Sequence, residues 1–261
     1  MTTGQPQELA QSLSVEVEAF FHTITRTDAF DKFVHARLMR ECDRLQKIDV
    51  VTASLFKALL ASSTGNVDAM NQWFANAERN GGTERVFVER MRHYVNHGYA
   101  SNALDMASRA FALRAGMPIM VIATMVASIG AFNAIVQAVD ASRARSEVLH
   151  MTPLLDVAKR ASVVVRQLGV ADADIAAMMD VAGEMLRVEK FLWQNDCIDI
   201  VVLEPSRGGP ALSLAYRIDV PAHQAAAMGW TLTEELMRRG LIRPGISVGF
   251  LGTALATPQA A

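Results

Sequence analysis

Acidic and basic side chains gather near the C-terminus at a spacing that could support hydrolytic chemistry. Asp199 and Glu204 lie on or beside a run of branched residues, and Arg217 and Asp219 alternate with apolar residues along the next run. Two carboxylates near a basic residue can form a metal-dependent nuclease site. However, Glu204 is followed by Pro-Ser-Arg, without a lysine two residues further on. An exposed sheet face with cross-strand ion pairs is therefore favoured, and a hydrolase-like or nuclease-like site at these four residues is the alternative.

Cysteine and histidine, the other residue types that commonly carry chemistry, form no recognisable site. Cys42 and Cys197 are far apart and lack metal-ligand spacing, so we expect buried thiols in a reducing compartment. His22 and His35 have no second ligand three or four residues on, and His223 stands singly. We therefore expect no metal and no cofactor, and we favour a non-enzymatic function while the enzyme alternative stays open.

One predicted helix, residues 84–97, carries a polar stripe that is suited to binding a protein partner. Polar residues recur there at positions i, i+4, i+7 and i+11, which share one helix face: Arg85, Glu89, Arg92 and Asn96. An apolar stripe runs beside them: Phe87, Met91, Tyr94 and Val95. The planar fork of arginine binds carboxylates bidentately, so the polar face could hold a partner's carboxylates or backbone. An ordinary solvated face, neutralised by neighbouring glutamates, is an equally good interpretation.

This helix belongs to the middle copy of a pattern that occurs three times between residues 50 and 148. Each copy places a small residue four or five positions after a glycine: Gly65 and Ala69, Gly98 and Ala103, Gly130 and Ala134. The alanines are 34 and 31 residues apart, and apolar-periodic segments of helix length precede each glycine. Such a period is typical of stacked helical hairpins. The predicted helix pairs are 49–62 with 66–79, 84–97 with 101–114, and 117–129 with 132–142.

The middle pair resembles a tetratricopeptide-repeat hairpin. The matching features are Gly98-Tyr99 at the turn, small residues in the second helix at Ala103, Ala107 and Ala110, and Pro118 just after it. This resemblance implies a concave surface that holds a peptide or a partner helix, in an adaptor or chaperone rather than an enzyme. A helical domain without true repeats is the alternative.

The segment from Ala115 to Val139 contains no charged residue and is long enough to cross a bilayer. However, Gly130 falls where the repeat places its turn, and Asn133 and Gln137 weaken the second half. Divided at Gly130, the segment gives two helices that are each too short to span a membrane. We therefore favour a buried hairpin over a membrane-associated protein.

Helices are also predicted before the repeats, and a small mixed domain after them. The first helix should cover residues 7–25, and Thr27 or Asp28 should cap the second. After His150 we expect two helices, strands at 198–203 and 212–220 that pair antiparallel, a helix from Pro221, and a strand at 246–251. The last strand follows a helical crossover, so it could lie parallel to the strand before it.

The overall composition agrees with a helical, globular protein. Of the 261 residues, 51% are hydrophobic and 20% are charged, with 14 methionines and abundant alanine. The net charge of −2 gives no reason to expect nucleic-acid binding. The first residues lack a basic region followed by an apolar run, so we expect no secretory signal and a cytoplasmic location.

These observations lead to one expected architecture and function. We expect a mostly α protein, with a helical-hairpin repeat array over residues 1–148, a small α+β domain with a three-stranded sheet over 149–253, and a flexible tail over 254–261. Its expected role is that of an adaptor, chaperone or regulatory subunit that binds a protein partner in a groove. The sequence does not define the oligomeric state.

Overall fold

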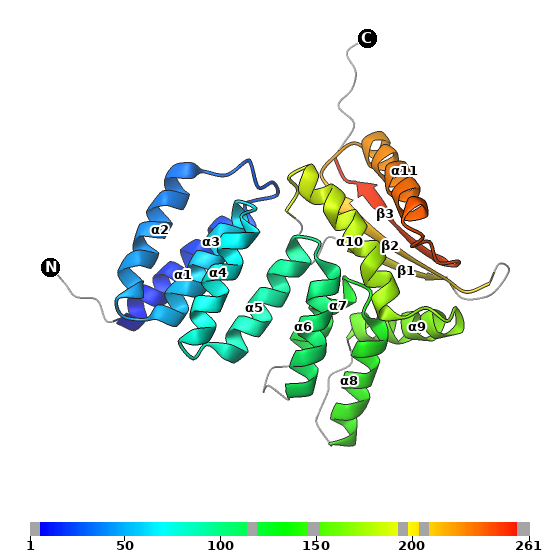
Figure 1. The fold of residues 1–261 in the computed structure, drawn as a ribbon, viewed down its shortest axis with the longest axis horizontal. Helices are drawn as coiled ribbons and strands as arrows, with labels where there is room; N and C mark the ends of the chain where they lie inside the picture. The colour runs from blue at the N-terminus through cyan, green and yellow to red at the C-terminus, as the bar shows by residue number, and fades with distance from the viewer. Residues whose placement is uncertain (1–5, 114–118, 146–151, 193–197, 204–208, 255–261) are drawn as a thin grey trace, which may run out of the picture. The chain divides into compact units, whose positions relative to one another are not determined.

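The computed structural model describes residues 6–113, 119–145, 152–192, 198–203 and 209–254. In these residues it contains eleven helices and one three-stranded sheet, and 69% of the structure is helical (Figure 1). The expected fold class, mostly α with a small α+β part, is therefore confirmed. The chain divides into two compact units, Met1–His93 with Arg187–Leu192, and Tyr94–Leu186 with Trp193–Ala261. The domain boundaries expected at 148 and 253 stay predictions.

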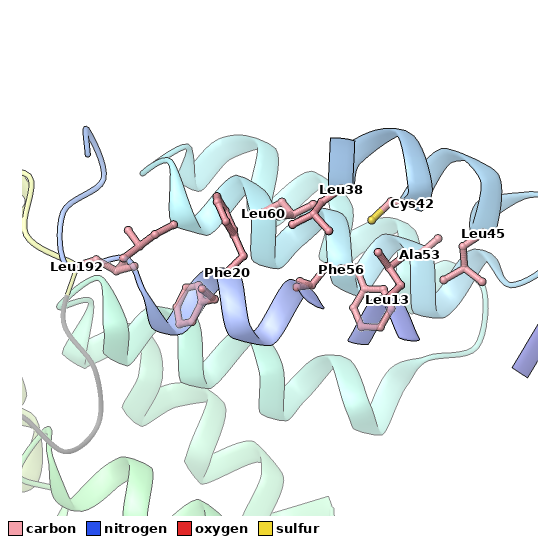
Figure 2. Close-up of a cluster of buried hydrophobic side chains, with 12 residues drawn as sticks. Leu13, Phe20, Leu38, Cys42, Leu45, Ala53, Phe56, Leu60 and Leu192 are labelled. Carbon is pink, nitrogen blue, oxygen red and sulfur yellow. The ribbon is translucent and has the colours of Figure 1, made fainter. Parts of the chain in front are cut away.

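The first unit is a set of packed antiparallel helices. They are α1 (Pro6–His22), α2 (Lys32–Gln46), α3 (Val50–Ser63), α4 (Val67–Arg79) and the part of α5 (Thr83–Asn96) up to His93. Figure 2 shows their core, in which large apolar side chains of α1, α2 and α3 point toward one another. Leu192 joins this core, because the segment after α10 (Asp172–Val188) pairs with the chain between α1 and α2. There Leu192 N–H donates to Thr25 O at 2.9 Å.

The cap of α2 differs from the expectation. Asp31 caps the helix, and its carboxylate accepts from the backbone N–H groups of Phe33 and Val34. Thr27 instead packs against Gly65 and donates its backbone N–H to Lys190 O at 2.8 Å. Both Thr27 and Asp28 are chemically able to cap a helix, so only the tertiary contact of Thr27 excludes it from that role.

The three predicted hairpins are present, and their turns share one geometry. The first is α3–α4, the second is α5–α6 (Ala100–Leu113), and the third is α7 (Ile119–Ala127) with α8 (Phe132–Ala144). Gly65, Gly98 and Gly130 have φ values of 71°, 65° and 79°, a left-handed conformation that favours glycine. The residue after each glycine donates its N–H to the carbonyl five positions earlier, as in a Schellman motif, at 3.0, 2.8 and 3.1 Å.

The division of the uncharged segment at Gly130 is likewise confirmed. Helix α7 has nine residues and α8 has thirteen, and the glycine turn separates them. No helix within the described ranges is both long and apolar enough to cross a membrane. Pro118, expected at the start of α7, lies outside the described residues.

The mixed part follows the predicted order of helices and strands. It consists of α9 (Pro153–Gln167), α10, β1 (Ile198–Leu203), β2 (Ala211–Ile218), α11 (Ala222–Arg238) and β3 (Ile246–Gly252). The sheet order is β1-β2-β3, with β1 antiparallel and β3 parallel to β2 (Figure 1). One face of β2 is buried by Leu212, Leu214, Tyr216 and Ile218, as the period of two predicts.

In the second unit, α10 lies directly on the turns of the second and third hairpins. A Cβ added at Gly183 of α10 would lie only 2.0 Å from the carbonyl oxygen of Gly98, so the two backbones touch. Eight residues earlier on α10, Ile175 fills the same place at the third hairpin, where a Cβ at Gly130 would lie 2.3 Å from its Cγ2. Eight residues of helix span about 12 Å, so α10 sets the spacing of the two turns.

Two aspartates of α10 also cap the helices that begin at these turns. The Asp180 carboxylate accepts from the backbone N–H of Ser101, at the start of α6. The Asp172 carboxylate accepts from the backbone N–H groups of Asn133 and Ala134 at 3.2 and 2.9 Å, at the start of α8. Helix α8 has no side-chain cap of its own, so α10 satisfies donors that a local residue would otherwise satisfy.

Replacing Gly183 by alanine should destabilise the protein, because the added methyl group overlaps the Gly98 carbonyl. We expect a loss of about 1–3 kcal/mol in the free energy of unfolding, measured by urea denaturation, despite the better helix propensity of alanine. Gly229 of α11 is a matched control, since a Cβ there would meet nothing within 4 Å. Gly229→Ala should stabilise by about 0.5–1 kcal/mol. A Gly183→Ala variant as stable as the wild type would show that the backbones of Gly183 and Gly98 are not in close contact.

The Asp172 carboxyl should make stability depend on pH. Burial raises its pKa above the ordinary 3.8, and the hydrogen bonds from Ala134 and Asn133 offset this only in part. The folded state therefore holds this proton more tightly than the unfolded state does. The stabilisation that comes from this tighter proton binding is fully present below the unfolded pKa of about 4. It is lost as the pH rises through the pKa of Asp172 in the folded state. The free energy of unfolding of the wild type minus that of Asp172→Asn should thus fall as the pH rises above about 4. A difference that grows with pH would refute the raised pKa of this half-buried carboxyl.

Candidate functional site

The polar stripe of α5 is only partly at the surface. Arg85 is exposed, and Arg92 is paired with Glu89, with 3.1 Å between Arg92 Nη1 and Glu89 Oε2. The Arg92 and Glu89 side chains are 41% and 27% exposed. These three residues lie in the first unit and keep a charged face that a partner can reach.

Asn96, the fourth residue of the predicted stripe, does not face solvent. It is 3% exposed, as is His97 beside it. The physical reason is that α10 packs onto the turn at Gly98 and covers this end of the helix. The apolar stripe also differs from the prediction: Phe87 and Tyr94 are only half-buried, and the buried residues are Val86, Val88, Met91 and Val95.

An open hollow of about 600 Å³ lies in the first unit, at the end where the α2–α3 and α4–α5 connections meet the start of α1. Its lining is part apolar and part polar: Gln7, Ala10, Ile48, Asp49, Val50, Val51 and Asn80. Its volume falls in the range of about 300–1,000 Å³ that is typical of ligand sites. Ile48 is 56% exposed there, so a large aliphatic side chain of the hollow is in contact with solvent.

The wall of the hollow reaches the turn that precedes α5. Val51 packs on the turn before α5, where a Cβ at Gly82 would lie 2.6 Å from Val51 Cγ1. Asp49 is occupied as the cap of α3, since it accepts the Thr52 N–H at 2.9 Å. Sequence patterns did not indicate this hollow, because its residues come from the start of α1, from the α2–α3 connection with the start of α3, and from the α4–α5 connection. The only local signal is Ile48, an aliphatic residue in a polar connection between two helices.

The first unit also contains a buried cation, Lys57 of α3, whose side chain is 3% exposed. Its Nζ lies 2.6 Å from Asp43 Oδ1, 2.5 Å from Gln46 Oε1 and 4.4 Å from the centre of the Trp73 ring. All three partners come from the neighbouring helices α2 and α4. With its donors directed to these partners, Lys57 joins three helices and is not poised for chemistry.

Cys42 lies in the core next to this group. Burial raises the pKa of its thiol to about 12, and the nearby Lys57 cation offsets only part of that rise. The thiol therefore stays neutral, so it is a packing residue and not a nucleophile. Cys197 lies outside the described residues.

The alternative catalytic residues lie on the open face of the sheet. Arg217 Nε is 3.5 Å from Asp199 Oδ1, and the two side chains are 46% and 42% exposed. Asp219 is exposed beyond the end of β2, and Glu204 lies outside the described residues. No cluster of three or more His, Cys, Asp or Glu that could hold a metal ion occurs in the part of the chain that is described. The described residues thus form the cross-strand ion pair that the sequence favoured.

Comparisons of the chain with protein-family models, curated proteins and solved structures gave no match. The function is therefore argued from the geometry of the described residues.

The two partners of the buried ion pair should differ in their effect on stability. Asp43→Ala leaves the Lys57 cation buried without its counter-charge, so we expect a loss of about 3 kcal/mol in the free energy of unfolding. Lys57→Met removes the buried charge and leaves Asp43, which is already 63% exposed, in solvent. That variant should cost about 1 kcal/mol or less. Urea denaturation of both variants and of the double variant measures the difference. If Lys57→Met costs as much as Asp43→Ala or more, Lys57 is not a buried cation that depends on Asp43 for its counter-charge.

Proposed function

We propose that this protein is a non-enzymatic protein-binding module, an adaptor, chaperone or regulatory subunit that holds a partner peptide or helix on its helical-repeat surface. The observation that carries the proposal is the open hollow at Ile48 in the first unit. An aliphatic side chain of the partner enters this hollow, because its apolar residues otherwise remain in contact with water.

Charges on α5 complement the apolar anchor. Arg85 is exposed and Arg92 is close to half-exposed, so both guanidinium groups can engage acidic groups of the partner. Asn80 also lines the hollow, and its side-chain oxygen can accept a backbone N–H of the partner while its Nδ2 donates to Asn76 O at 2.7 Å. The partner is thus a segment with an aliphatic residue next to acidic residues.

The resemblance of the middle hairpin to tetratricopeptide repeats, whose arrays bind peptides, also favours this role. The location we propose is the cytoplasm, in keeping with the buried, unpaired thiol of Cys42.

Site-specific photo-crosslinking tests this function in the cells that produce the protein. A photoreactive phenylalanine in place of Ile48 or Arg85 should form an adduct with one particular polypeptide. The same group in place of Ser108, an exposed residue of α6, should not. Adducts that are absent, or equally abundant at Ser108, would exclude the hollow as the binding site.

Charge reversal then tests the role of the arginines on the polypeptide so identified. Arg85→Glu with Arg92→Glu should weaken binding at least tenfold, because two attractive contacts become repulsive. Arg109→Glu on α6 is the matched control, since Arg109 is 59% exposed and should leave the affinity unchanged. Unchanged binding by the double variant would show that the α5 face does not take part.

A further inference from the structure

The solvent side of α2 carries one continuous row of basic residues that begins at an aromatic side chain, which we call the α2 stripe. Its members recur at positions i, i+4, i+7, i+11 and i+14, and all are exposed: Phe33, Arg37, Arg40, Arg44 and Lys47. At about 100° per residue, these positions lie within about 80° of the helix circumference. The buried residues of the helix lie on the opposite side, in the core (Figure 2): Leu38, Cys42 and Leu45. The α2 stripe therefore faces away from the core of the first unit.

The α2 stripe keeps a net positive charge, because two of its cations are not neutralised. Arg40 and Lys47 form no ion pair with any residue that the structure describes. Nearby acids are bound elsewhere, since Asp43 is held by the buried Lys57 cation at 2.6 Å and Asp31 caps α2.

The other two cations of the stripe are paired but stay accessible. Arg37 pairs with Glu16 of α1 at 2.7 Å, and Arg44 pairs with Glu41 at 2.9 Å. The two arginine side chains are 48% and 71% exposed. A guanidinium has five N–H donors, so each can bind a further anionic group.

Phe33 adds an aromatic ring to the start of the stripe. Its side chain is 89% exposed, the highest value among the large hydrophobic residues that the structure describes. The ring has a fixed place, because the Phe33 backbone N–H donates to the capping Asp31 carboxylate at 2.8 Å. An aromatic side chain beside cations is the combination that enters the headgroup region of a bilayer.

The geometry of the helix favours a flat anionic surface over nucleic acid. The stripe is about 21 Å long and runs along a convex side, so all its side chains can reach one plane. Glu41 and Asp43 lie about 80° to either side of its centre, where they point along a flat surface and not into it. A DNA major groove surrounds the helix that it holds, so it would bring both acids toward phosphates.

We propose that the α2 stripe binds the surface of a membrane that contains anionic lipids. Arg40 and Lys47 contact lipid phosphates, and the Phe33 ring enters the boundary between headgroups and acyl chains. The contact is peripheral, with α2 lying parallel to the membrane plane. Because few cations take part, binding is reversible and weakens as salt screens the charges.

Co-sedimentation of the full-length chain with vesicles tests this surface. The wild type should pellet with vesicles of equimolar phosphatidylcholine and phosphatidylglycerol, and stay in solution with phosphatidylcholine alone. Arg40→Glu with Lys47→Glu should lower the partition coefficient on the anionic vesicles by about tenfold or more, because two attractive charges become repulsive. Arg109→Glu with Arg160→Glu is the matched control. It changes the net charge equally, at arginines of α6 and α9 that are 59% and 46% exposed, and should bind like the wild type.

Phe33→Ser tests the aromatic anchor without a change of charge. It should lower the partition coefficient by about tenfold, because the apolar area that leaves water is lost. Val163→Ser on α9 is its control, since Val163 is 47% exposed and should leave binding unchanged. An unchanged partition coefficient for Phe33→Ser would overturn the insertion of the ring.

Arg40→Gln with Lys47→Gln repeats the test if the charge-reversed variant loses its native circular dichroism spectrum. A wild type that binds neither kind of vesicle, or both equally, overturns the proposal. Binding that persists in the α2 variants, or that is lost equally in the controls, also overturns it. Loss of binding in the α2 variants only supports it.

Duplex DNA and polyglutamate, each offered in place of the vesicles, identify the occupant. Both should bind more weakly than the anionic vesicles. Tighter binding of either one through the α2 stripe overturns the membrane assignment and replaces it with nucleic acid or an acidic polypeptide. The residues changed in these variants do not line the hollow at Ile48, so the outcome is independent of the partner proposed for the hollow.

Discussion

The contact between α10 and the hairpin turns is the constraint on which the second unit depends. Two backbones can touch at Gly98 and Gly183 only because neither residue has a Cβ. Once that contact is made, the rise of the helix places Ile175 on the next turn and brings Asp172 and Asp180 to two helix starts. Packing, spacing and capping are therefore set together by one helix.

Several charged residues in this protein join one element to another. Lys57 joins α3 to α2 and α4, and Asp172 and Asp180 supply caps that α8 and α6 receive from another element. Arg243 extends the same principle, since it pairs with Asp174 at 2.8 Å and so attaches the segment before β3 to α10. Buried or half-buried charges cost desolvation energy, which directed hydrogen bonds or ion pairs offset, although at Asp172 they do so only in part. Residues available for binding are accordingly found among the exposed groups, such as Arg85, Ile48 and Phe33.

The hollow at Ile48 combines aliphatic and polar lining residues. We propose that it receives an apolar anchor of a partner segment, while the exposed arginines of α5 engage acidic residues of that segment.

The sequence by itself determined the local features of this protein. Helix and strand periodicity depends on which side chains alternate between core and solvent, and a glycine turn depends on one left-handed residue. Both are local properties, so the sequence predicted the helices, the turns at Gly65, Gly98 and Gly130, and the succession of helices and strands along the chain. Only the tertiary structure decided which polar residues stay exposed. Asn96 is buried and Thr27 does not cap α2, because α10 and the segment after it approach from more than 80 residues away. The hollow at Ile48 likewise exists only where two connections meet the start of α1, and a pattern within one helix cannot contain that information.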